Sequence, residues 1–202
     1  MSVSLSPTRI RFDKEVSKLE TILKGFQDIP VNFQYLISEV ILIRVASLLE
    51  FGIAEVSYKI ASGSLYLDGS VPKIIVPCRS MQAARTAMLL HGRKSPKNHL
   101  KWSRSKFIRE AVENVIDPQD HFVITCTNFG AIISEIFKVR NFAAHRTTSS
   151  KTEFREVVKT IYGRERKVQL GYFLLTENYV SVPNLTRYLI ESRVVINELT
   201  RF

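Results

Sequence analysis

Residues 31–60 read VNFQYLISEVILIRVASLLEFGIAEVSYKI, and the apolar spacing of this stretch sets the architecture expected of the whole chain. Within its most apolar part, residues 35–58, charged residues occur at Glu39, Arg44, Glu50 and Glu55, so we expect a buried helix of a globular protein and not a membrane span. The apolar residues recur three or four positions apart, which is the period of a helix and not of a strand. They are Tyr35, Leu36, Val40, Ile43, Ala46, Leu49, Ile53 and Val56.

Helical segments are also predicted on both sides of this stretch. Ser6 is expected to cap a helix that has Pro7 at its first position and that ends near residue 26. The apolar run 121–126 is too short to assign to a helix or a strand. Further helices are predicted over residues 80–91, 102–115, 130–146, 152–162 and 183–200.

Residues 167–182 follow a different pattern. Val168, Leu170, Tyr172 and Leu174 stand at alternate positions, which is the period of a strand, so a short β-hairpin is predicted here. No stretch is long enough to be a linker between domains. We therefore expect residues 1–202 to form a single, mainly all-α domain, a bundle of five to seven helices with a small hairpin at 167–182.

Composition excludes several classes of protein. Hydrophobic residues make up 45% of the 202 residues and charged residues 24%, which is typical of a globular chain with a sizeable core. Two cysteines, Cys78 and Cys126, cannot form a disulfide scaffold, and the sequence has no zinc-ligand spacing. The first residues lack a signal peptide's apolar core. We expect a cytoplasmic protein without a membrane span, a metal or a cofactor.

The net charge of the whole chain, +10, equals the net charge of residues 69–109 alone. Residues 69–109 contain ten basic side chains and no acidic one, and Trp102 lies among them. Cations beside an aromatic ring are typical of surfaces that bind phosphates and stack on bases, although a solvated pair of helices would show the same charge. The predicted RNA-binding residues are Arg79, Arg85, Arg93, Lys94, Lys97, Lys101, Trp102, Arg104 and Lys106.

Residues 131–146 read AIISEIFKVRNFAAHR and have one apolar and one polar face. The polar face of Ser134, Lys138, Asn141 and His145 points away from the helix's own core. Arg140 lies five residues before His145, which is about 140° around a helix. Arg140 and His145 therefore act together only if the helix loosens near residue 144 or if they meet across an interface.

The hexapeptide Arg140-Asn141-Phe142-Ala143-Ala144-His145 resembles the R-x(4–6)-H signature of HEPN domains, in its R-N-x-x-A-H form. The order of Leu48-Leu49-Glu50-Phe51 and of Asp117-Pro118 before it is similar to that of the prokaryotic HEPN families of defence and toxin–antitoxin loci. The resemblance implies a metal-independent endoribonuclease. It also implies a homodimer in which the motifs of two subunits meet in one cleft, and an antitoxin or other regulatory protein as a partner.

Under this resemblance, four residues would carry out the reaction. His145 would be the general acid or base for cleavage through the RNA 2′-OH, and Arg140 would bind the phosphate with its permanent charge. Asn141 would bind the substrate or orient the imidazole of His145. Glu50 would orient Arg140 or His145 from the preceding long helix.

Two other interpretations remain open on the residues alone. His145 near a helix C-terminus would stabilise the helix dipole by about 0.3–1 kcal/mol, and Arg140 would be a surface charge that faces Glu135 or Glu156. The chain would then be a non-catalytic helical module that binds nucleic acid or a partner protein through its basic surface.

Overall fold

The computed structural model describes residues 4–26, 28–177 and 181–201, and these residues form an all-α bundle, as predicted. Nine helices lie within the described ranges, more than the expected five to seven, because the run 121–126 and the segment after residue 167 each contain a short helix. The helices are α1 (Ser6–Gly25), α2 (Val31–Ala61), α3 (Met81–Leu90), α4 (Ser105–Val112), α5 (His121–Asn128), α6 (Gly130–His145), α7 (Thr148–Tyr162), α8 (Leu170–Leu175) and α9 (Asn184–Thr200).

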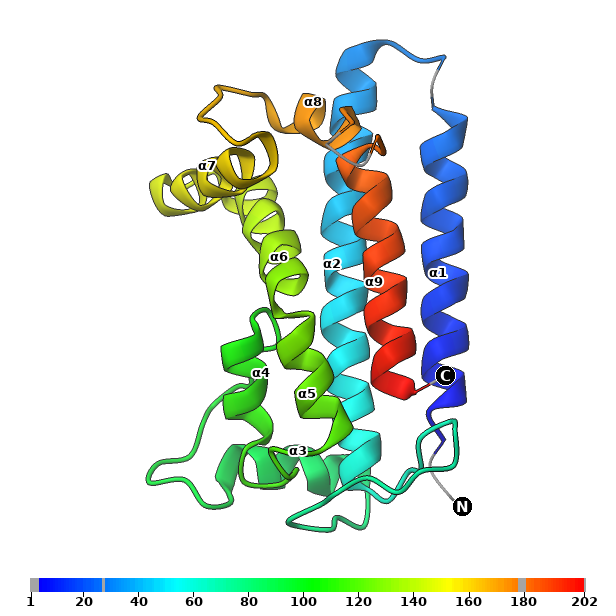
Figure 1. The fold of residues 1–202 in the computed structure, drawn as a ribbon, viewed down its shortest axis with the longest axis vertical. Coiled ribbons are helices and arrows are strands. Elements are labelled where there is room, and N and C mark those ends of the chain that lie inside the picture. The colour runs from blue at the N-terminus through cyan, green and yellow to red at the C-terminus, as the bar shows by residue number, and fades with distance from the viewer. Residues whose placement is uncertain (1–3, 27, 178–180, 202) are drawn as a thin grey trace.

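The 31-residue helix α2 is the centre of the bundle and contacts α1, α3, α6, α8 and α9. Figure 1 shows α1 and α9 alongside α2 on one side, with α5 and α6 on the other. Gly52 of α2 allows a close approach of α9, because a Cβ there would lie 2.7 Å from Ile196 Cδ1. The face of α2 turned into the core contains Ile41, Leu42, Val45, Leu49, Ile53 and Val56.

The N-terminal half of α2 departs from the expected burial. Leu36 and Val40 have the helical spacing that the sequence predicts, yet each is 58% exposed. They lie on a side of α2 that no described helix covers, together with Phe33 and Phe51. The predicted helix is therefore correct, whereas the predicted apolar face is only partly the core face.

The hairpin predicted over residues 167–182 is wrong. Residues 170–175 form α8, the only nearby pairing described is an isolated bridge between Glu177 and Pro183, and residues 178–180 lie outside the described ranges. Leu170, Phe173 and Leu174 are buried at helical spacing. Gly171 brings α8 against α2, since a Cβ there would lie 2.7 Å from Tyr35 Cα. The contact with α2, which is distant in sequence, thus decides that residues 170–175 form a helix and not a strand.

Helix boundaries differ in smaller ways. α1 begins at Ser6 and follows the buried Leu5, without the side-chain cap expected of Ser6. α7 begins at Thr148, earlier than predicted, because the Thr147 side chain accepts a hydrogen bond from the Ser150 amide. Ser80 caps α3 in the same way through the Ala83 amide.

Among the described residues, no single helix is long and apolar enough to cross a membrane. The consecutive helices α5 and α6, bent by 61° at their junction, pass the length and composition test only when they are taken together.

Candidate functional site

The RNFAAH sequence forms the last turns of α6, which packs against α2 and α7. Ile133, Ile136 and Val139 are buried and hold the helix against the core. The helix stays regular to His145 and ends at Arg146, whose φ of 50° is left-handed and whose amide donates to the Phe142 carbonyl at 3.2 Å. The loosening of the helix near residue 144, one of the two expected ways of joining Arg140 to His145, is therefore not seen.

Arg146 adopts the left-handed conformation in spite of its Cβ, at a cost of about 1–2 kcal/mol. Two contacts fix its side chain. Its guanidinium forms an ion pair with Glu39 of α2 and lies 4.8 Å from the ring centre of Phe142. The end of the motif helix is thus attached to α2.

Arg140 is attached to α2 one to two turns earlier. Its guanidinium lies 3.6 Å from the Glu50 carboxylate and donates a hydrogen bond to Asn141 Oδ1 at 3.2 Å. Its Nε is buried and has no hydrogen-bond partner among the described residues. Arg140 is therefore held in place while part of its donor capacity stays unused.

Neither surface partner considered for Arg140 contacts it. Glu135 accepts hydrogen bonds from Arg187 and Tyr188, and Glu156 pairs with Lys138. The interpretation of Arg140 as a charge facing Glu135 or Glu156 is wrong, because these carboxylates already bind other side chains.

His145 lies apart from this cluster. It is exposed, and within the described ranges it makes no hydrogen bond or ion pair. Since the helix is regular, His145 stands about 140° around the axis and about 7.5 Å along it from Arg140. One chain thus brings Glu50, Arg140 and Asn141 together and leaves His145 outside them.

Two predicted RNA-binding residues belong to the interior. The Arg93 side chain is 7% exposed and donates to the backbone carbonyls of Met88, Glu110 and Ala111, which joins α3 to α4. Trp102 is 5% exposed and packs edge-on against Tyr58 of α2, 5.7 Å between ring centres. The Arg93 guanidinium is thus engaged by three carbonyls and by Glu113, and Trp102 is buried, so neither side chain is free for the phosphate contact or the base stacking predicted for it.

Several of the remaining predicted cations have acidic neighbours from other segments. Glu110 lies 3.9 Å from Lys97 and 4.0 Å from Lys106, and Glu153 of α7 pairs with Arg104. Residues 69–109 contain no acidic side chain, but in the folded chain acidic side chains of other residues lie beside several of their cations. Among the predicted RNA-binding cations, the exposed ones that form no ion pair with a described residue are Arg79, Arg85, Lys94 and Lys101.

Sequence reasoning left aside a second group of cations, on α7 and after it. Lys151, Arg155 and Lys159 are exposed and recur every four residues, so they share one face of α7. Arg166 and Lys167 line the same two hollows as Arg155. The sequence did contain a signal for this group, because the cations recur every four residues within residues 135–167, whose net charge is +5.

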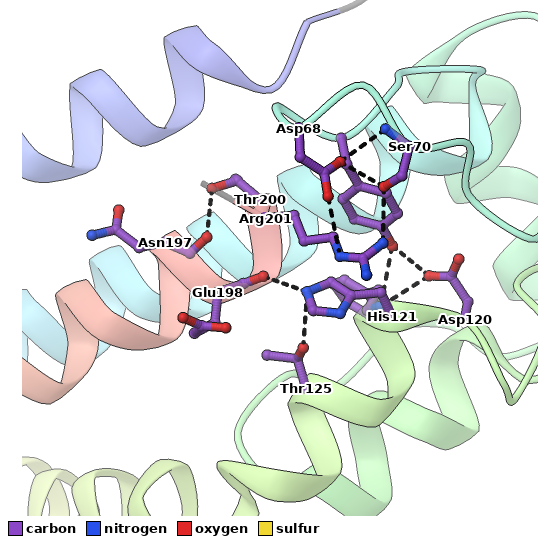
Figure 2. A network of polar contacts seen from close by, with 11 residues as sticks. Asp68, Ser70, Asp120, His121, Thr125, Asn197, Glu198, Thr200 and Arg201 are labelled. Atoms are coloured by element: carbon purple, nitrogen blue, oxygen red, sulfur yellow. Dashed lines mark hydrogen bonds and ion pairs between the residues drawn. The ribbon is translucent and has the colours of Figure 1, made fainter.

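A third polar cluster joins the loop after α2 to the start of α5 and the end of α9 (Figure 2). Asp120 accepts hydrogen bonds from Tyr66 Oη and from the Lys73 and Phe122 amides. Burial first, and the hydrogen bond to and charge of Asp120 second, raise the pKa of Tyr66 well above its ordinary value. The phenol therefore stays protonated and acts as a structural donor.

His121 belongs to the same cluster. Its Nε2 lies 2.7 Å from the Glu198 carbonyl oxygen, which can only accept, so this nitrogen carries the proton (Figure 2). Arg201 donates to Ser70 Oγ at 2.9 Å and lies 3.4 Å from Asp68. Because these groups bind one another, the cluster stabilises the fold and leaves His121 without a part in the candidate chemistry.

Other chemistry has less support in the described ranges. No group of three or more His, Cys, Asp or Glu side chains there is arranged to hold a metal ion. Burial raises the pKa of both thiols, Cys78 and the fully buried Cys126, so both are protonated at neutral pH.

Comparisons with models of protein families, with curated proteins and with solved structures found no match for this chain.

Proposed function

We propose that the chain is a metal-independent, cytoplasmic endoribonuclease of the HEPN type that acts as a toxin or defence effector. The observation that carries the proposal is the pair of functional groups at the end of α6. Arg140 is held by Glu50 and Asn141 with 24% of its side chain exposed, and His145 is exposed to solvent on the same helix.

These groups match the needs of RNA cleavage through the neighbouring 2′-OH. A base removes the 2′-OH proton, the 2′ oxygen bonds to phosphorus, and the bond from phosphorus to the 5′ oxygen breaks as an acid protonates that oxygen. An imidazole serves for either proton transfer near neutral pH. A guanidinium stabilises the added negative charge on the phosphate oxygens. The products carry a 2′,3′-cyclic phosphate and a 5′-hydroxyl.

One chain provides only one such imidazole, at an unfavourable angle to Arg140, so the proposed enzyme is a homodimer with a composite site. A two-fold axis would supply two copies of His145 and two of Arg140. The uncovered side of α2 is the surface proposed for the second copy. It borders the two glutamates that contact α6 and contains Phe33, Leu36, Val40 and Phe51, each more than half exposed.

The test is an assay of purified wild type and His145→Ala on mixed RNA with excess EDTA. We expect the wild type to cleave and to leave cyclic phosphate ends, and the variant to melt like the wild type without cleaving. Equal cleavage by both proteins would overturn the assignment of His145. Cleavage by neither, together with RNA binding, would overturn the enzymatic proposal.

The second candidate is a non-catalytic module that binds nucleic acid or a regulatory protein such as an antitoxin. The exposed cations Arg79, Arg85 and Lys94, which have no ion pair among the described residues, favour it. In that case His145→Ala would retain the cellular function, whereas reversing the charge of Arg85 and Lys94 would abolish it.

A further inference from the structure

We propose that α7 and the segment after it, and not residues 69–109, form the surface that binds the phosphates of the RNA. The inference rests on the proposed function for the identity of the polyanion. Its position on the protein rests on the arrangement of cations and hollows. The proposed surface consists of Lys151, Arg155, Lys159, Arg164, Arg166 and Lys167.

The acids near this surface are largely engaged elsewhere. Glu153 pairs with Arg104 of the segment 69–109, and Glu156 pairs with Lys138 of α6. Glu165 is the exception, since it lies 3.7 Å from Lys159. Its 84% exposure leaves this ion pair weak and easily exchanged.

Most of the cations stay available to a ligand. Lys151, Arg155, Arg164 and Lys167 are exposed and form no ion pair within the described ranges. The Arg166 guanidinium lies over the Tyr162 ring, 4.9 Å from its centre, which leaves the edge of the fork free for phosphate. A polyanion gains affinity here by releasing its counterions. Residues 69–109 also contain exposed cations without an ion pair, so the hollow that joins the α7 cations to Phe142 of α6 distinguishes the two surfaces.

Two hollows connect these cations to the motif helix. One, of about 580 Å³, is lined by residues of α7 and of 165–167, including Lys159. The other, of about 330 Å³, shares Arg155, Arg166 and Lys167 with the first and extends to Phe142 of α6. Phe142 stands between Arg140 and His145 in sequence and stacks on Phe154 of α7 at 4.8 Å. An RNA strand bound along α7 would therefore reach α6, the proposed catalytic helix.

The test compares two variants of equal charge loss in the His145→Ala background, which prevents cleavage during the measurement. One is Arg155→Ala/Arg166→Ala/Lys167→Ala on the proposed surface. The matched control is Arg79→Ala/Arg85→Ala/Lys94→Ala on the segment 69–109. All six side chains lie at the surface, so both variants are expected to melt like the parent. Affinity for a labelled single-stranded RNA is measured by fluorescence anisotropy over a range of salt concentrations.

We expect the α7 variant to bind at least about tenfold more weakly than the parent, with a salt slope shallower by about two, and the control to change by about twofold at most. A larger loss in the control, or equal losses, would overturn the proposal. If the α7 variant melts early, Lys151→Gln/Lys167→Gln measured against Arg79→Gln/Lys94→Gln provides a comparison at equal charge loss. Failure of the wild type to cleave RNA, with binding still lost in the α7 variant, would reject the ribonuclease and retain the surface.

Discussion

The guanidinium of Arg140 lies 3.6 Å from the carboxylate of Glu50, so an ion pair joins the RNFAAH helix to the central helix of the bundle. Glu39 and Arg146 make a second ion pair between the same two helices. Only the first of these pairs includes a residue assigned to the reaction. This difference provides a matched test of Glu50 as a positioning residue.

Glu50→Gln removes the charge that holds Arg140, and Glu39→Gln removes the equivalent charge beside Arg146. We expect Glu50→Gln to lower kcat by about tenfold with little change in KM, because misplacing a catalytic group affects the transition state most. Both variants should lose about 1 kcal/mol of stability or less, since the pairs are partly exposed. Steady-state cleavage and urea unfolding measure the two effects. A similar fall in kcat for both variants would show that Glu50 is merely structural.

Mixing two inactive variants tests the composite site. Arg140→Ala retains His145, and His145→Ala retains Arg140, so a heterodimer would contain one intact site if each site uses one residue from each subunit. Random exchange makes half of the dimers heterodimers, and the expected cleavage is about a quarter of the wild-type value. Cleavage is measured after the two proteins are unfolded and refolded together. Absence of any recovery, with dimers present by light scattering, would exclude a site made of one His145 and one Arg140 from different subunits.

Arg93→Ala is expected to destabilise the protein by about 2–4 kcal/mol. Its buried guanidinium satisfies three backbone carbonyls that would lose their donors. The neighbouring Lys94 is exposed, so Lys94→Ala should stay within about 0.5 kcal/mol of the wild type. Urea unfolding of the two variants makes the comparison. Equal stabilities would mean that Arg93 is a surface cation after all.

The ion pair of Glu55 with Lys59 predicts a dependence of stability on pH. Burial alone raises the pKa of Glu55, but hydrogen bonds from Lys59 and Thr8 and the charges of Lys59 and Arg11 outweigh it, so the pKa lies below its ordinary value of 4.5. A lowered pKa stabilises the fold above about pH 4.5, and this stabilisation is lost as the pH falls through the folded-state value.

Glu55→Gln should therefore be less stable than the wild type by about 2 kcal/mol at pH 7, because Lys59 is buried and loses its counter-charge. The difference should shrink as the pH is lowered from 7 towards 3, because the wild-type carboxyl takes up its proton as the pH falls through its lowered pKa. Urea unfolding at both pH values measures it. A difference that is constant with pH would show that packing, and not charge, is responsible.

The predictions from sequence succeeded where the signal is local. The apolar spacing of residues 31–60 predicted α2 within one residue of its end, and the polar face of residues 131–146 correctly predicted an exposed His145. They failed where a distant segment decides. Val168 to Leu174 have the alternate spacing of a strand, yet the contact of Gly171 with Tyr35 of α2 selects a helix.

The charged segment shows the same division. Ten cations without an acid are visible in the chain, but the pairing of Arg104 depends on Glu153 of α7, and the burial of Trp102 depends on Tyr58 of α2. Packing of α3 against α4 similarly turns Arg93 into an interior donor.

The order of residues alone specifies the longer helices, the excess of positive charge and the five-residue separation of Arg140 and His145, because periodicity and spacing are properties of neighbouring positions along the chain. Helix packing specifies which carboxylate holds Arg140, which cations stay free on α7 and which side of α2 is left uncovered. These properties depend on side chains that are up to about a hundred residues apart in sequence and become neighbours only when the core is formed.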